Sequence, residues 1–246
     1  MGSKISMSVL FFVSLSHFVS LNIGVPLAPA LYILGDSILD SGNNNNLSTT
    51  AKVNYLPYGS KFKLGPTGRF TNGKTIADFV AEYLGLPYVP PVMGLRDRNI
   101  TTEKDLPRLI PNKELPKYLA NSIMIFSVGS NDYINNYLRP EKFNSSRIFN
   151  PEQYAKLLND RLSKDLQRVY HMGFRKIIVF ALGPIGCVPA IRDLTSHTGP
   201  CVTKVNQYVA RYNIQLAASL LKLTASLKGS TFVLGGGSAI NITGKF

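Results

Sequence analysis

Two polar motifs in this sequence could together carry out acyl transfer, because each directly follows a short apolar run. Gly35-Asp36-Ser37 follows the run at 31–34, and Gly129-Ser130-Asn131 follows the run at 122–128. Residues directly after a parallel strand emerge at its carboxyl end, where ligand sites form. On a sharp strand-to-helix turn, Ser37 would expose its hydroxyl as a nucleophile and place its N–H where a helix N-terminus stabilises negative charge. The Asn131 amide could donate a hydrogen bond to the same oxyanion.

The two runs belong to an alternating pattern of short β-rich and longer helical segments that begins at Leu31. The predicted strands are 31–34, 122–128, 176–182 and 231–234, and the predicted helices are 75–84, 151–172 and 202–227. Continuous apolar strands predict a sheet that is covered on both faces. The order of elements predicts a parallel α/β sandwich with right-handed crossovers. The proline-rich stretch 85–116 is expected to be irregular surface within the same domain.

Four longer segments resemble the plant GDSL esterase/lipase family of the SGNH hydrolase superfamily, in residues and in order. They are LYILGDSILDSGNNN, PYGSKFKLGPTGRFTNGKTIADFVAEYLGLP, FSVGSNDYINNYL and the run from Pro151 that ends in FRKIIVFALGPIGCVP. The resemblance covers roughly residues 30–233 and implies a three-layer αβα sandwich with a flavodoxin-like parallel sheet. It also implies hydrolysis of carboxylic esters or acyl lipids without metal or cofactor. By position, Ser37 corresponds to the family's nucleophile and Asn131 to an oxyanion donor, while Ile38 stands where the family usually has Leu.

Two parts of the family pattern do not occur in this sequence. Residues 93–119 hold no counterpart of the family's stretch Gly-Val-Asn-Tyr-Ala-Ser-x-Ala-Ala-Gly, whose glycine N–H is another oxyanion donor. No Asp-x-x-His motif occurs in the 246 residues, although the family's catalytic aspartate and histidine come from such a C-terminal motif. The hydrolase domain is therefore expected to be C-terminally incomplete and the chain to be a weak or inactive esterase.

The histidines of the chain offer one weak replacement for the absent base. His17 falls in the N-terminal apolar run, and His171 is predicted at a helix end, about 20 Å from the site at the far end of the next strand. His197 follows the third strand on the correct side of the sheet, so it is either a substitute base or an exposed loop residue. Asp36 and Asp40 are predicted to be structural, as turn and first-helix-turn residues that complement a helix dipole.

The N-terminus has the layout of a secretory signal peptide. Lys4 is the only charge before Asp36, an apolar run spans 7–19, and small residues follow it. Residues 1–30 are expected to be the signal, cleaved between Ser20 and Ala30, and residues 31–246 to be a partial hydrolase domain. A buried first strand or helix is the alternative. No later stretch approaches the roughly twenty apolar residues of a spanning helix, so the processed protein is expected to be soluble and extracellular.

The cysteines and glycosylation sequons fit an extracellular protein. Cys187 and Cys201 are an even pair and are expected to form a disulfide. Two cysteines without neighbouring histidines fall short of a zinc site, so no metal is expected. Asn-x-Ser/Thr sequons, each weak by itself, stand at Asn46, Asn99, Asn144 and Asn241.

The formal charge of +13 comes from dispersed basic residues, since no Lys/Arg run exceeds two. Such a surface is expected to associate weakly with anionic polymers and not to bind nucleic acid specifically. The expected partner is a small-molecule ester or a lipid substrate.

Two other functions compete with ester hydrolysis. The first is a non-catalytic ester- or glycan-binding protein, or a truncated gene product without function, which the absent Asp-x-x-His motif favours. The second is a nucleotide-binding α/β domain. Gly235-Gly236-Gly237 follows a predicted strand, but no Gly-x-Gly-x-x-Gly opens a βαβ unit, which argues against this second function.

Overall fold

The centre of the computed structural model, which describes residues 25–92, 110–196 and 198–236, is a four-stranded parallel sheet. Its strands are β1 (Leu31–Gly35), β2 (Ile123–Ser127), β3 (Lys176–Phe180) and β4 (Thr231–Gly235). They are ordered β1-β2-β3-β4, with Leu31 opposite Ile123 and Lys176 opposite Thr231. All four predicted strands are thus confirmed, with ends that move by at most two residues.

The three predicted helices are also present, and two of them begin at capping residues that the sequence contains. They are α2 (Ile76–Tyr83), α7 (Pro151–His171) and α9 (Thr203–Ser226). Thr75 and Asn150 cap the first two, each in a capping box that pairs the cap with the residue three positions later. Gly173, with φ +115, follows the end of α7 in the left-handed conformation that glycine adopts without strain.

Shorter elements surround the carboxyl end of the sheet and the approach to β2, and the sequence patterns did not predict them. They are α4 (Leu115–Asn121), α5 (Ser130–Asp132), the π-helix η3 (Tyr133–Tyr137), α6 (Ser145–Ile148), the 3₁₀ turn η4 (Ile185–Cys187) and α8 (Pro189–Leu194). Each is too short to show a hydrophobic period, which is the signal that sequence analysis relies on.

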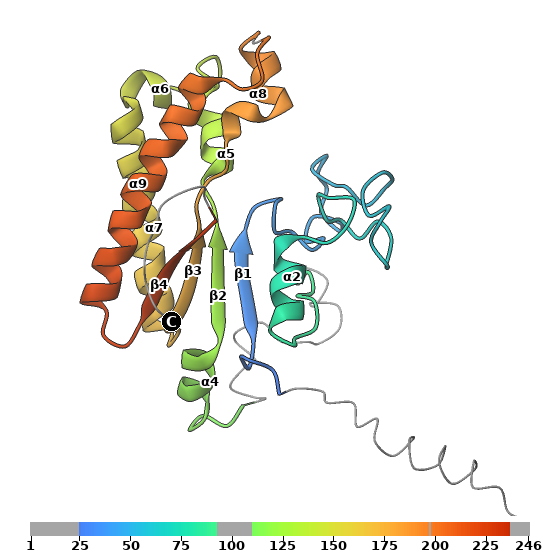
Figure 1. Cartoon of the computed structure of the whole chain (residues 1–246), viewed down its shortest axis with the longest axis vertical. Helices are drawn as coiled ribbons and strands as arrows, with labels where there is room; N and C mark the ends of the chain where they lie inside the picture. Colours follow the sequence, from blue (N-terminus) through green and yellow to red (C-terminus); the bar gives the residue numbers. More distant parts are fainter. Residues whose placement is uncertain (1–24, 93–109, 197, 237–246) are drawn as a thin grey trace, which may run out of the picture.

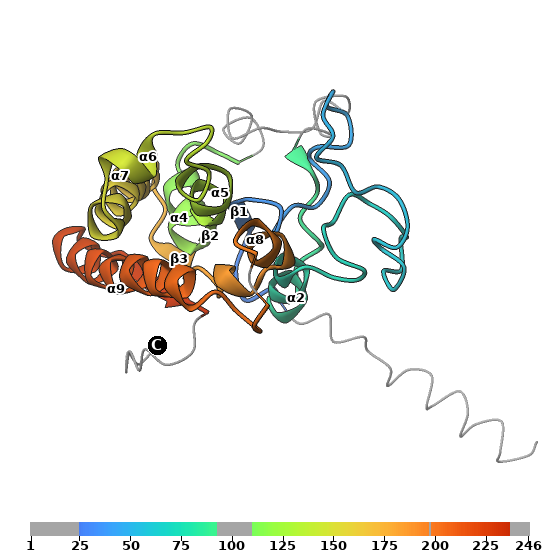
Figure 2. The same cartoon turned by 90° about the horizontal axis from the view of Figure 1, so that it is seen from above.

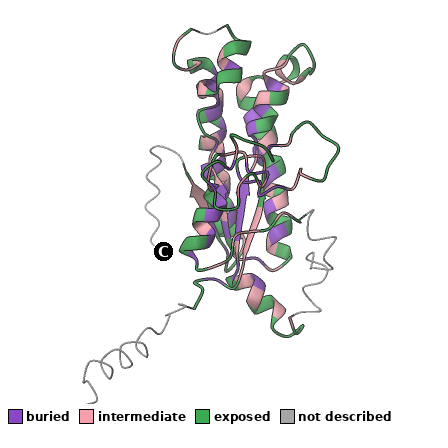
Figure 3. Cartoon of the chain, turned by 90° about the vertical axis from the view of Figure 1, so that its right-hand side faces the viewer, coloured by how far each residue is buried: buried purple, intermediate pink, exposed green. Residues whose placement is uncertain are grey.

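Helices cover both faces of the sheet and give it three layers (Figure 1). Met124 and Phe126 point to the large core under α7 and α9, whereas Ile125 points to a smaller cluster under α2. This alternation is the period of a β-strand. Figure 3 shows the buried residues along the strands and the inner sides of the long helices. Cover is thinner on the α2 side, where Ile178 and Phe180 are only half-buried.

Helix α2, which lies in the connection between β1 and β2, packs on a different face of the sheet from the later helices. Strand order increases steadily across the sheet, yet α2 lies on the opposite face from α7 and α9. The connection from β1 to β2 also includes residues 93–109, which lie outside the described residues, so right-handed crossovers remain a prediction. Both faces of the sheet are apolar, and α2 covers the face that α7 and α9 leave open.

A buried ion pair ties the long loops after β1 to α2. Arg69 donates to both carboxylate oxygens of Asp78 at 2.8 Å, and it also reaches the Ser41 carbonyl at 3.3 Å. The guanidinium stacks 4.5 Å above the ring of Phe62. One arginine thus connects the loop that follows the Gly-Asp-Ser motif, the loops around Phe62 and the first turn of α2.

Candidate active site

Ser37 lies just beyond the carboxyl end of β1, on a tight turn. The Asp36 N–H donates to the Ser127 carbonyl at 3.1 Å, which extends the pairing of β1 with β2 by one residue. The chain then turns, because Ile38 N–H donates to the Asp36 carboxylate and Leu39 N–H to the Asp36 carbonyl, both at 3.1 Å. Ser37 is left partly exposed at the tip of this turn.

The helix expected after Ser37 is not there. The Asp40 carboxylate accepts hydrogen bonds from the Gly42 N–H at 3.0 Å and the Asn43 N–H at 2.8 Å, and Gly42 has φ +120. Asx turns of this kind compete with helix formation, so the chain stays in turns until α2. Asp40 is therefore a turn residue and not a first-helix-turn residue. Within the described residues the Ser37 N–H has no acceptor, so it can donate to an oxyanion, but without a helix dipole behind it.

Asn131 lies beyond the carboxyl end of β2, in the short helix α5, and is exposed to solvent. Gly129 begins this turn with φ +116, a conformation that L side chains rarely adopt. The Asn135 amide N–H donates to the Asn131 side-chain oxygen at 3.0 Å. This bond occupies the acceptor of the Asn131 amide and leaves its N–H₂ group for a substrate oxyanion.

The structure brings these two motifs to neighbouring strand ends. Gly35 is opposite Ser127 in the sheet, and a β-carbon on Gly35 would lie 3.2 Å from the Ser127 carbonyl oxygen. Burial raises the pKa of Asp36, and burial together with the negative charge of Asp36 raises the pKa of Asp132. The turn of Ser37 and the turn of Asn131 thus follow neighbouring strands at the carboxyl end of the sheet.

Tyrosines of α7 and α9 pack against the segment that contains Asn131. Tyr133 is fully buried, and its ring makes edge-to-face contacts with those of Tyr154 and Tyr212, at centroid distances of 5.4 and 6.3 Å. The Tyr154 hydroxyl donates to the Asp132 carbonyl at 3.0 Å. Burial, followed by the charge of Asp132, raises the pKa of Tyr154 to about 12, so this hydroxyl remains a donor at neutral pH.

These tyrosines were not predicted as part of the site. They come from positions far apart in the sequence, and only the packing of α7 and α9 against β2 brings them to the motif. The available signal was the period of buried residues along each helix, which includes one tyrosine in each and indicates a core and not a site.

No base contacts the Ser37 hydroxyl among the residues that the structure describes. His171 is the last residue of α7, directly before β3, so it lies toward the amino end of the sheet as expected. His17 and His197 lie outside the described residues. The same described portion contains no cluster of three or more His, Cys, Asp or Glu side chains.

The Cys187–Cys201 disulfide is present and closes the loop after β3. This loop carries α8 and approaches the first turn of α9, where the Val202 N–H donates to the Gly186 carbonyl at 2.8 Å. A β-carbon on Gly186 would lie 2.3 Å from the Val202 carbonyl oxygen, so only glycine permits this approach. The disulfide therefore links two segments that already contact each other at the carboxyl end of the sheet.

Replacing both Cys187 and Cys201 by serine is expected to lower the free energy of unfolding by about 3 kcal/mol, the value for a closed loop of about fifteen residues. The physical reason is the extra freedom of the unfolded chain once the cross-link is gone. Urea unfolding of the oxidised protein and of the double variant measures the difference. Equal midpoints and slopes for the two proteins would contradict the prediction.

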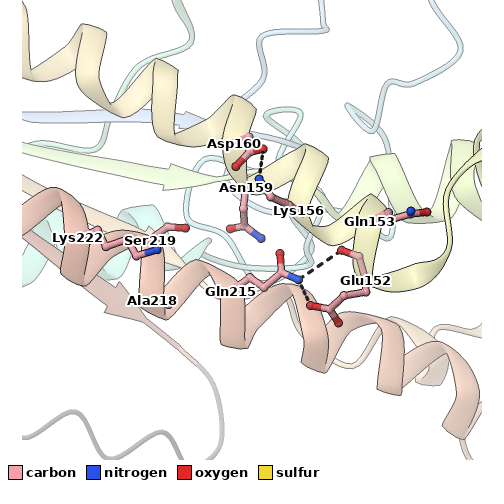
Figure 4. Close-up of a pocket in the computed structure, with 9 residues that line it drawn as sticks. All are labelled: Glu152, Gln153, Lys156, Asn159, Asp160, Gln215, Ala218, Ser219 and Lys222. Carbon is pink, nitrogen blue, oxygen red and sulfur yellow. Dashed lines mark hydrogen bonds and ion pairs between the residues drawn. The ribbon is translucent and has the colours of Figure 1, made fainter.

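A pocket of about 320 Å³ lies apart from these motifs, between α7 and α9 (Figure 4). Its charged and polar lining is largely paired with itself, since Lys156 binds Asp160 at 2.7 Å and Gln215 binds Glu152. The pocket includes none of the predicted site residues.

A serine and an amide at the carboxyl ends of adjacent parallel strands, with N–H groups free to bind an oxyanion, are the arrangement of an α/β enzyme that acts on carbonyl groups. The GDSL-like lipase/acylhydrolase family matches residues 31–236. The chain belongs to this family, and this places it among the hydrolases of ester bonds.

Curated plant proteins show the same relationship. GDSL esterase/lipase 7 of Arabidopsis thaliana is 40% identical over 85% of this chain and 68% of its own length. Two other Arabidopsis GDSL esterase/lipases are 34% and 33% identical over 87% of this chain and over 67% and 65% of their own lengths. The chain therefore spans about two thirds of the length of these relatives.

Proposed function

We propose that this protein hydrolyses carboxylic esters or lipid acyl esters through Ser37. The hydroxyl attacks the ester carbonyl and forms an acyl-enzyme, while the N–H of Ser37 and the amide of Asn131 bind the oxyanion. The observation that carries the proposal is the placement of both groups at neighbouring strand ends with their N–H groups unoccupied within the described residues. No cofactor takes part in this reaction.

Secretion is part of the proposal. Residues 1–24 lie outside the described residues, and the predicted signal peptide within 1–30 rests on their sequence. The disulfide, which persists in oxidising compartments, supports an extracellular protein. Two of the four sequons, Asn46 and Asn144, are exposed as glycosylation requires, and the other two lie outside the described residues. No helix of the described portion is long and apolar enough to cross a membrane.

We expect the 246 residues by themselves to hydrolyse esters only slowly. A serine hydroxyl needs a base within hydrogen-bond reach, and none reaches Ser37 from the described part of the chain. The same observation favours the second candidate function, a non-catalytic protein that binds esters or glycans. Weak association with anionic polymers is compatible with either function, because it follows from the net charge of +13.

Reaction with an organophosphonate tests the proposed nucleophile. Slow labelling is expected, because no described base contacts the Ser37 hydroxyl, and the label should fall on Ser37. Ser37 is partly exposed, whereas the neighbouring serines of the two motifs, Ser41 and Ser130, are each only 8% exposed. Peptide mapping by mass spectrometry locates the label, and Ser37→Ala is the control. Label on Ser41 or Ser130 would refute the assignment. Binding of an ester with no labelling at all would favour the non-catalytic candidate.

Replacing Asn131 by alanine is expected to lower kcat about a hundredfold or more, the usual cost of one oxyanion donor. Asn135→Asp should also lower kcat, because a carboxylate at 135 accepts from the Asn131 N–H₂ group and turns it away from the oxyanion. Asn135→Ala removes the restraint without this competition, so its loss should be smaller. The measurement is the kcat of each variant, made in protein to which an Asp-x-x-His segment has been added. The expected losses decrease from Asn131→Ala or Asn135→Asp to Asn135→Ala.

The control for this series is Asn54→Ala, which removes an exposed amide that belongs to neither motif. Melting temperatures should agree among the variants, since Asn131 and Asn135 are also exposed. An Asn135→Asp variant with the kcat of the unaltered protein would contradict the proposed orientation of the Asn131 amide.

A further inference from the structure

The loop formed by residues 55–65 displays large apolar side chains to solvent. Tyr55 is 56% exposed, and Leu56 and Leu64 are each 68% exposed. Figures 1 and 2 both show the long loops that contain it, coloured blue to teal, on the side of the molecule away from α7 and α9. Burying three such side chains against a partner would be strongly favourable, so their display requires an explanation.

The exposure belongs to an ordered loop. The Gly59 N–H donates to the Thr71 carbonyl at 2.9 Å, and the Gly65 N–H donates to the Phe62 carbonyl at 2.9 Å. A β-carbon on Gly59 would lie 2.3 Å from the Gly65 carbonyl oxygen, so the two arms of the loop touch. Phe62 is buried under the guanidinium of Arg69. The loop therefore holds Leu56 and Leu64 outward, on arms that are packed together.

The charge around these leucines is of one sign. Residues 41–77 contain five basic residues and no acidic one. Arg69 is paired with Asp78 and Lys74 with Glu82. Lys61 and Lys63 are exposed on the 55–65 loop itself, and neither has an acidic partner among the described residues. The loop thus combines exposed apolar side chains with uncompensated positive charge.

We propose that the 55–65 loop docks this protein on an anionic lipid surface. Leucines enter the boundary between headgroups and acyl chains, while lysines remain with the anionic headgroups. An anionic polysaccharide would bind the lysines but would not bury the leucines. A second copy of this chain would bring the same positive charges together.

Docking in this way would hold the candidate active site near the lipid. The Asn45 amide donates to the Thr67 carbonyl at 3.0 Å, and Arg69 binds the Ser41 carbonyl, so the loops are tied directly to the turn after Ser37. The docking proposal itself requires no catalysis, and it can be tested in protein that turns over no substrate.

Sedimentation with phosphatidylcholine vesicles, with and without phosphatidylglycerol, tests the proposal. The protein is expected to bind the anionic vesicles. Replacing Leu56 and Leu64 together by serine should lower the partition coefficient about a hundredfold, at roughly tenfold per leucine. Replacing Lys61 and Lys63 by alanine should lower it about fivefold per lysine.

The matched control is the pair Ile214→Ser and Leu221→Ser on α9, which removes apolar side chains that are 65% and 61% exposed. This control should keep the binding of the unaltered protein, and all variants should keep its melting temperature. Equal losses for the control and the leucine variants would overturn the proposal. Vesicle binding that depends on the lysines alone would also overturn it, because this indicates a polyanion site. Self-association that the leucine variants abolish would overturn it as well.

Discussion

Joining the family's C-terminal Asp-x-x-His segment to this chain is expected to raise ester turnover at least about a thousandfold, and Ser37→Ala should remove that gain. Triad members act as a unit that supplies about a millionfold acceleration, and roughly a thousandfold to ten-thousandfold remains when they are removed. The described residues include the proposed nucleophile and the two proposed oxyanion donors but no base at the Ser37 hydroxyl. The measurement is kcat/KM for a short-chain nitrophenyl ester before and after the addition.

Two controls separate chemistry from folding in this experiment. The added segment with its histidine replaced by alanine should give the same melting temperature without the gain in turnover. Strong turnover by the 246 residues alone, lost in Ser37→Ala, would contradict the expectation. A further loss in His197→Ala would then identify His197 as the base.

Replacing Arg69 by alanine is expected to lower the free energy of unfolding by about 3–5 kcal/mol, because it leaves the buried Asp78 carboxylate without its partner. The variant also loses the contact with the Ser41 carbonyl and the stacking on Phe62. Urea unfolding measures the loss. Lys156→Ala, which breaks an exposed pair with Asp160, is the matched control and should cost less than about 1 kcal/mol.

The same ion pair predicts a dependence of stability on pH. Burial by itself would raise the pKa of Asp78, but hydrogen bonds from Arg69 and from the Thr75 N–H outweigh it and hold the pKa below the usual value. A depressed pKa contributes stability that is present above the unfolded value of about 3.9 and is lost as the pH falls through the folded value. The unaltered protein should therefore lose more stability below pH of about 4 than Asp78→Asn. Parallel losses for the two proteins would rule out this contribution.

The strands and long helices could be predicted from the sequence because their signals are local. Asn150 caps α7, Gly173 follows its end, and the apolar runs are long enough to define every strand to within two residues. The positions of Ser37 and Asn131 follow from the same signals, since residues that follow parallel strands must emerge at one edge of the sheet. Their catalytic roles remain predictions.

The turn at Ser37 shows where a local signal led to a wrong expectation. Gly-Asp-Ser after a strand suggested a helix, but the carboxylates of Asp36 and Asp40 bind the backbone N–H groups that follow them. Such side-chain bonds offer the backbone an alternative to helix, and composition does not reveal which of the two is formed.

The sequence by itself determined the family, the order of elements and the two motifs, because these depend on residues near one another in the chain. The tertiary structure alone decided the support of the Asn131 turn by Tyr154 and Tyr212, the placement of α2 on the opposite face, and the outward display of Leu56 and Leu64. Each of these depends on which apolar surface is already covered when distant segments pack together. That competition for burial is a property of the whole fold, so no single segment of the sequence encodes it.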